Sequence, residues 1–287
     1  MKKITAHRKS SKVNMGGIIL DQPLPTATID QVDPFLLIHH WKDRLPGNQL
    51  QKNVGVGVHP HRGFSPVTFI FKGAVHHKDS EGNDEIVTEG GVQWMFAGRG
   101  IMHSERPPAY LAEEGGDFEI IQLWVNVPAK YKMDNPSYQP VKTEDMPRFI
   151  SDDEKVKIDV VAGQFNEIEG KIEHPSPLNV FRLDMDTDGE VELDVPEGYQ
   201  ALMYILDGEL EVNEYVVGKG KEMFVFAEEG KNVTLKANQE TRTIFLAAPP
   251  INEEVATYGP FVMNTESEVM QALRDAQMGK MGVLLEE

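Results

Sequence analysis

The chain has 287 residues, with 28 Lys and Arg against 46 Asp and Glu, and its formal charge is −18. A field of that sign repels nucleic-acid phosphates and anionic lipid surfaces, so we expect neither as a direct partner. The absence of cysteine excludes disulfides and thiolate metal ligands. No apolar run is long enough to cross a membrane or to form a secretory signal, and we therefore predict a cytoplasmic protein.

The first half of the chain is a series of short strand-like stretches. Runs rich in Val, Ile, Phe and Trp are separated by glycine turns, and DSEGND has the composition of a hairpin loop. Short strands at this spacing are typical of a β-sandwich or a β-barrel. The stretches are DPFLLIHHW, GVGVHPHRGF, VTFIFKGAVHH, NDEIV, GGVQWMFAG, IMHSE and DFEIIQLWVNVP.

The second half repeats this pattern after a segment rich in Pro and charge. MYILDGELEV echoes TFIFKGAVHH, since each is a strand, a glycine turn and another strand. An internal duplication of one barrel explains both the echo and the length. We predict a barrel at 1–135, a linker at 136–155, a second barrel at 156–250 and a tail with a helix at 251–287.

The tail changes from strand to helix periodicity. Thr265 is a candidate N-cap with Glu268 three residues later, which is a capping box, and Gly279 is a candidate C′ residue. One apolar face is predicted for this helix. It consists of Val269, Ala272, Leu273 and Ala276.

Two residue pairs in the first half predict a metal site. His59 and His61 are two positions apart, and so are His103 and Glu105. Alternate residues of a strand point to the same side, so neighbouring strands would bring three imidazoles and one carboxylate to one point. The second half has only one histidine after Val156, so we expect no second site.

This ligand set suits one divalent first-row metal. Four protein ligands on a six-coordinate ion leave two positions open, which favours Fe(II), with Mn, Co, Ni, Cu or Zn as alternatives. A four-coordinate zinc would instead be structural. No further cofactor-binding residues are predicted.

The remaining histidines and two arginines have open interpretations. At most one of His76 and His77 points inward, and the same holds for the pair His39 and His40. Either pair is structural or supports the ligands. Arg62 and Arg99, beside the predicted ligands, support them, gate the pocket or stabilise turns.

The motifs resemble the pirin family of bicupins. HPHRGF, GAVHHKDSEGN and QWMFAGRGIMHSE carry the resemblance, which continues through LWVNVPAKYKMDNPSYQ to RDAQMGKMG. It implies two tandem cupin barrels, jelly-roll-like and all-β, with the metal in the first on His59, His61, His103 and Glu105. Ser65 stands where the general cupin pattern has a glutamate; in pirins the carboxylate comes from the position of Glu105 instead.

The resemblance also implies two functions. One is a quercetin 2,3-dioxygenase, in which Glu105 is the catalytic base, the partners are O₂ and a small planar aromatic substrate, and Phe64, Trp94 and Met95 either line the pocket or belong to the core. The other is a non-catalytic regulatory protein that responds to the redox state of its metal and has a protein partner. A metal-dependent isomerase or another oxygenase fits the same ligands. Two barrels in one chain mimic a cupin dimer, so we predict a monomer.

Overall fold

The computed structural model describes residues 1–286 and is built mainly of strands. Strands make up 53% and helices 9% of the chain, which confirms the predicted all-β class. None of the helices in residues 1–286 is long and apolar enough to cross a membrane.

Two compact units form, and each combines two separate stretches of sequence. The first, here called the histidine unit, joins residues 38–144 to the segment that begins at Ile251. The second, here called the apolar unit, joins residues 1–37 to residues 145–250. This grouping differs from the predicted division at 135 and 156. The predicted linker 136–155 contributes one strand to each unit, because its first part pairs with β9 and its last part with β14.

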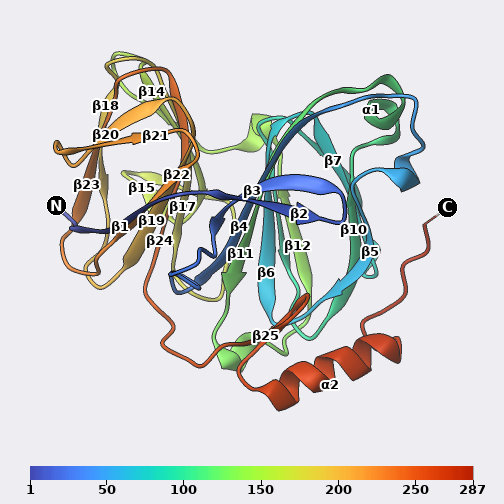
Figure 1. Cartoon of the computed structure of the whole chain (residues 1–287). Coiled ribbons are helices and arrows are strands. Elements are labelled where there is room, and N and C mark those ends of the chain that lie inside the picture. The colour runs from blue at the N-terminus through green and yellow to red at the C-terminus, as the bar shows by residue number, and fades with distance from the viewer. Residues whose placement is uncertain (287) are drawn as a thin grey trace. The chain divides into compact units, whose positions relative to one another are not determined.

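The histidine unit contains two antiparallel sheets (Figure 1). The part of the larger sheet that belongs to this unit has the order β12-β9-β6-β11-β4, and the smaller sheet has the order β5-β10-β7-β8. A six-residue helix that the sequence did not predict, α1 (Ala109–Glu114), follows β10. The strands are β4 (Phe35–Leu45), β5 (Val56–His61), β6 (Phe64–Lys72), β7 (Ala74–Asp79), β8 (Asp84–Thr88), β9 (Val92–Phe96), β10 (Ile101–Arg106), β11 (Gly116–Asn126) and β12 (Ser137–Val141).

The apolar unit has the same construction. Its sheets have the orders β1-β22-β19-β24-β17-β14-β13 and β18-β23-β20-β21. Two hairpins, β2–β3 and β15–β16, complete it. The strands are β1 (Ile4–Lys9), β2 (Ser11–Met15), β3 (Ile18–Leu24), β13 (Arg148–Ile150), β14 (Val156–Ala162), β15 (Gln164–Phe165), β16 (Ile168–Glu169), β17 (Asn179–Met185), β18 (Glu190–Asp194), β19 (Gln200–Asp207), β20 (Glu209–Val212), β21 (Val216–Lys219), β22 (Glu222–Phe226), β23 (Asn232–Ala237) and β24 (Thr241–Ala248).

The matching strand orders fit the duplication inferred from the sequence. The small sheet β5-β10-β7-β8 corresponds to β18-β23-β20-β21, and the core β9-β6-β11-β4 corresponds to β22-β19-β24-β17. In the apolar unit a continuous cluster fills the interior, including Phe181, Met203, Phe224 and Phe245, each fully buried. Burial of aromatic and aliphatic side chains is the main source of stability for such a barrel.

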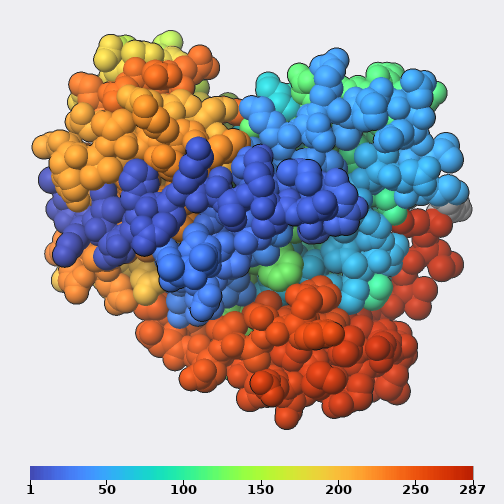
Figure 2. Space-filling view, viewed as in Figure 1, coloured from blue at the N-terminus to red at the C-terminus, as the bar shows by residue number. Residues whose placement is uncertain are grey.

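The C-terminal segment belongs to the histidine unit and ends in the predicted helix. A short hairpin, β25 (Ala256–Tyr258) with β26 (Phe261–Met263), precedes α2 (Glu266–Gln277). The Thr265–Glu268 capping box is present, and Gly279 has a φ of 72°, as expected for a C′ residue. Val269 and Ala272 are buried against Phe261 and Met263. The other side of α2 is part of the molecular surface (Figure 2).

Candidate metal centre

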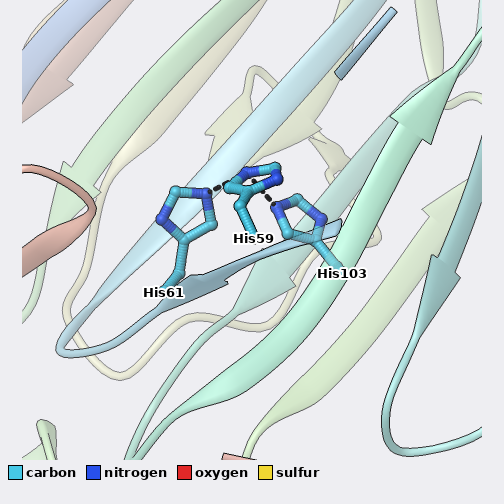
Figure 3. Close-up of side chains that lie close together, drawn as sticks. All are labelled: His59, His61 and His103. Atoms are coloured by element: carbon cyan, nitrogen blue, oxygen red, sulfur yellow. Dashed lines mark hydrogen bonds between the residues drawn. The ribbon is translucent and has the colours of Figure 1, made fainter. Parts of the chain in front are cut away.

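Three histidines converge between β5 and β10. His59 lies directly opposite His103 in the pairing of these strands, and His61 follows two positions later on β5. The Nε2 atom of His59 is 3.0 Å from that of His61 and 2.9 Å from that of His103 (Figure 3). All their ligand atoms lie within 4.8 Å of one another. The alternation of a strand thus brings together the three imidazoles that the sequence singles out.

Burial keeps these imidazoles neutral. It lowers the pKa of His59, and it lowers those of His61 and His103 well below the usual value, with the neighbouring histidines adding to the shift in these two. Glu105 and the Gly57 carbonyl partly offset the shift at His59. Neutral imidazole is the form that binds metal ions.

Two backbone carbonyls fix the direction of the free lone pairs. His59 donates from Nδ1 to the Gly57 carbonyl at 2.8 Å, and His61 donates from Nδ1 to the Pro260 carbonyl at 3.2 Å. In each neutral ring the other nitrogen, Nε2, is then an acceptor without a proton. Two such acceptors 3.0 Å apart cannot hydrogen-bond to each other. A cation between them satisfies both, so this donor set fits a metal ion.

Glu105, the fourth predicted ligand, lies beside this triad. Among the described residues, the group whose ligand atoms lie within 4.8 Å contains only the three histidines. The Glu105 carboxylate instead accepts from Thr68 Oγ1 at 2.6 Å, from Gln122 Nε2 at 2.7 Å and from Gln93 Nε2. These three donors were not predicted from the sequence, because polar residues inside strand-like stretches resemble ordinary solvent-facing positions.

The C-terminal segment holds the turn that follows the β5 ligands. Val262 donates its N–H to the Arg62 carbonyl, and Gly63 adopts a φ of 87°. A Cβ at Gly63 would lie 2.0 Å from the Val262 carbonyl oxygen, so only glycine fits there. The Lys132 ammonium donates to the carbonyls of Gly63 at 2.7 Å and Val262 at 3.1 Å. The turn is therefore fixed from two sides.

The other histidines of the unit have local partners. On β7, His77 is buried and points inward, where its Nε2 lies 2.9 Å from Asp79 Oδ2. His76 lies 2.5 Å from Asp84. His40 lies 3.0 Å from Glu119. Among the interpretations left open above, His77 and not His76 is the member of its pair that faces the site.

The flanking arginine and aromatic residues are also placed. Arg62 forms a buried ion pair with Asp275 of α2 at 3.0 Å, so it holds the helix rather than gating a pocket. Phe64 packs edge-on against His61, with ring centroids 5.1 Å apart. Trp94 follows Gln93 on β9 and so points to the opposite face from the amide that reaches Glu105. Met95, on the same face as Gln93, packs with Ile101.

Family models cover most of the chain. The model described as Pirin matches residues 17–125, and the model described as Pirin C-terminal cupin domain matches residues 180–282. The cupin part of the fold prediction is thereby confirmed. Several similar proteins are named "Putative quercetin 2,3-dioxygenase", and two of them, one from each of two organisms, illustrate the likeness. The one from Thermoplasma acidophilum is 38% identical over 81% of this chain and 94% of its own length. The one from Pseudomonas aeruginosa is 33% identical over 93% of both.

Other relatives bear only the family name, and solved structures share the fold. A pirin-like protein of Solanum lycopersicum is 33% identical over 93% of this chain and 88% of its own. A crystal structure of quercetin 2,3-dioxygenase from Acinetobacter baumannii is 36% identical, covers 99% of this chain and 100% of that one, and superimposes with a TM-score of 0.93. An Escherichia coli pirin in complex with nickel(II) is 18% identical over 85% of this chain and 99% of its own, with a TM-score of 0.68. At that identity the likeness concerns the fold alone.

Proposed function

Because the chain belongs to the pirin family, we propose that it is a metal-dependent dioxygenase of the quercetin 2,3-dioxygenase type. In this proposal it opens the central ring of a flavonol with O₂ and releases carbon monoxide. The observation that carries the proposal is the convergence of three imidazoles beside a carboxylate, with the unprotonated Nε2 atoms of His59 and His61 facing each other. The names of the relatives and of the Acinetobacter baumannii structure support the choice of substrate class.

The chemistry of the ligands guides the choice of metal in this proposal. Three imidazoles and one carboxylate suit a divalent first-row metal, and four protein ligands on a six-coordinate ion leave two positions open. We therefore propose Fe(II) as the native metal, with Mn, Co, Ni, Cu or Zn as alternatives.

The proposed ligands of the ion are His59, His61, His103 and Glu105. When bound, the ion supplies a Lewis acid that favours the deprotonated hydroxyl of the substrate. Glu105 accepts the proton of the flavonol 3-hydroxyl as general base. Its hydrogen bonds to Thr68 and Gln122 hold the carboxylate oxygens in place for that transfer. A cytoplasmic location and a monomeric state belong to the same proposal.

A direct assay tests this function. The purified protein is loaded with Fe(II) without oxygen and mixed with quercetin and O₂, and loss of the flavonol absorption band and release of carbon monoxide are measured. His103→Leu, which removes one lone pair, is the matched control and should be inactive. Failure of every flavonol with every first-row metal would contradict the proposed reaction. Full turnover by Glu105→Gln would show that Glu105 is not the base.

One observation favours a second function, a metal-binding regulatory protein without catalysis. His61, His103 and Glu105 are 2%, 1% and 8% exposed and His59 is only partly exposed, so little of the site is open to a flavonol. A protein partner would instead bind to one of two surface conformations, which depend on the redox state of the metal. Tight metal binding without turnover, together with a difference in hydrogen exchange between Fe(II)- and Fe(III)-loaded protein, would support this alternative.

A further inference from the structure

The small sheet of the histidine unit carries on its outer face a cavity of about 490 Å³, which the proposed function does not use. Strand β10 lines this cavity with Ser104 and Arg106, whereas the alternate residues His103 and Glu105 point to the opposite face. Residues 50–52, two residues of β7 and the C-terminal segment complete the wall. The cavity and the metal centre therefore lie on the two sides of one strand.

The Arg106 guanidinium is held in place as a receptor for a carboxylate. Its Nη1 donates to the Val54 carbonyl at 2.8 Å, and its Nη2 packs so closely on Gly57 that a Cβ there would lie 2.7 Å away. Nε and Nη2 reach the two carboxylate oxygens of Glu286 at 2.8 and 2.7 Å. Two parallel charge-assisted bonds are the geometry in which arginine binds carboxylates most specifically. These bonds lower the pKa of the Glu286 carboxyl, so it binds as the anion.

The carboxylate that occupies Arg106 belongs to a loosely attached segment. The Glu286 side chain is 19% exposed, whereas Val283 and Leu285 are 70% and 85% exposed. These two apolar residues lie in water while the charged residue lies against the barrel, which is the reverse of ordinary burial. The ion pair with Arg106 is therefore the main attachment of this end of the segment. A single ion pair that water reaches is a weak attachment, so a free carboxylate can replace Glu286.

The wall of the cavity is cationic, although the chain as a whole has a charge of −18. Its lining contains Lys52, Lys78 and Arg106 against one carboxylate, which is that of Glu286. Asp84, beside the cavity, is 3.2 Å from Lys78. When Glu286 leaves, Lys52 and Arg106 face the cavity with no carboxylate in its lining. A concave wall of one charge sign attracts ions of the opposite sign.

From these observations we propose that this cavity, here called the Arg106 pocket, is a second binding site, which takes a small organic acid. The carboxylate of the acid replaces Glu286 on Arg106, and its apolar body lies against Leu50, which lines the same wall. The volume is within the range of small-molecule sites. Glu286 is then a tethered competitor that lowers the apparent affinity until the ligand displaces it. This proposal does not depend on the proposed reaction, because none of these residues is a proposed metal ligand.

The test uses para-fluorobenzoate as the probe, and fluorine NMR measures its binding to the purified full chain. Glu286→Gln removes the competing charge and keeps the shape of the side chain, so the apparent Kd should fall about tenfold relative to the parent. Glu240→Gln changes the same charge at an exposed position of the apolar unit, and as the matched control it should bind as the parent does. Equal affinity of the parent and Glu286→Gln would overturn the proposal.

Substitutions of Arg106 in the Glu286→Gln background locate the bound probe. Arg106→Lys keeps the charge but cannot form the two parallel bonds, so it should weaken binding about tenfold, and Arg106→Leu should abolish binding. Lys52→Gln, at an exposed position, serves where the Arg106 variants fail to fold, and it should weaken binding about twofold. Binding that persists unchanged in all of these variants, as it would at an ion held by the histidine triad, would also overturn the proposal.

Two further ligands test the chemical class. Para-fluorobenzamide has the same shape without the charge and should not bind. Inorganic phosphate should displace the probe only at a much higher concentration than unlabelled benzoate does. Equal binding of the amide would show an apolar site, and equal displacement by phosphate would show a general anion site. Either result would overturn the assignment to an organic acid.

Discussion

The histidine unit and the apolar unit share a strand order but enclose different interiors. Across three corresponding strands the apolar unit aligns Phe224, Met203 and Phe245, each fully buried. The histidine unit aligns Gln93, Thr68 and Gln122 in the same kind of row. The backbone framework therefore does not determine the chemistry of the interior.

What differs is how each interior stabilises its barrel. The apolar row packs into one continuous cluster and gains stability from surface removed from water. The polar row must instead satisfy every donor and acceptor, because an unpaired buried polar group is costly. The duplicated barrel has thus kept one copy as a stable core and used the other to hold a site. Substitutions in the two units are therefore expected to have different effects.

Truncation in the apolar unit should give the largest loss of stability. Phe245→Ala leaves a cavity in the cluster, and we expect a loss of about 3–5 kcal/mol in the free energy of unfolding. Metal bound per folded chain should stay unchanged. Chemical denaturation and metal analysis on the same sample check this. Loss of metal from protein that is still folded would show that the two interiors are not independent.

Metal should stabilise only the histidine unit. A ligand that binds the folded state at a free concentration of 100 times its Kd adds about 2.7 kcal/mol. We expect that gain in the parent protein and not in His103→Leu. Without metal, His103→Leu should unfold at or above the parent temperature, because the buried Nδ1 of His103 has no hydrogen-bond partner in residues 1–286. Calorimetry with and without Co(II) compares the unfolding temperatures of the two proteins. A marked fall in the unfolding temperature of metal-free His103→Leu would contradict this expectation.

Each unit also buries one lysine against backbone carbonyls, and Lys132 gives a pH dependence. Burial lowers its pKa from 10.5 to about 8. Between these values the unfolded chain holds a proton that the folded chain has released, so stability rises with pH. The full contribution of Lys132 to the free energy of unfolding is present above pH 10.5, and it is lost as the pH falls through about 8. The free energy of unfolding rises by at most about 1.4 kcal/mol per pH unit.

Lys132→Met is the control for that pH dependence. The difference between parent and variant removes the contributions of other groups, including Lys2 of the apolar unit, whose pKa burial also lowers. Stabilities from urea denaturation at pH 7, 8, 9 and 10 give the two slopes. Equal slopes would mean that Lys132 titrates normally in the folded protein.

The smallest expected effect on stability concerns α2 of the histidine unit. Thr265→Ala removes the cap of α2 and should cost about 1 kcal/mol, whereas Thr265→Ser should cost a few tenths. Thermal unfolding measures both. Because α2 packs on the β25–β26 hairpin, hydrogen exchange in that hairpin should increase as well.

The sequence predicted the features that depend on local periodicity. Alternation placed the strands, the Thr265–Glu268 box placed the start of α2, and i, i+2 spacing placed His59, His61 and His103 on one side. These signals are contained within a few residues, so they survive without knowledge of the fold.

Features that depend on distant partners were not predictable in this way. Nothing in ITAHRK indicates that β1 pairs with β22, and nothing in GPFVM indicates that Pro260 accepts from His61. The hydrogen bonds to Glu105 were not predicted, because Gln93, Thr68 and Gln122 become one row only through strand pairing.

Each unit combines two separate stretches of the chain, so the two units are completed one after the other during synthesis. Lys2 binds carbonyls at residues 199, 227 and 228, so the apolar unit is complete while the last segment is still being made. His61 hydrogen-bonds to the Pro260 carbonyl, which is 199 residues later in the chain. At roughly 5–20 residues per second, translation of that stretch takes about 10–40 s. A chain that stops early lacks the group that orients this imidazole. Formation of the intact triad therefore requires that the chain has been made at least as far as Pro260.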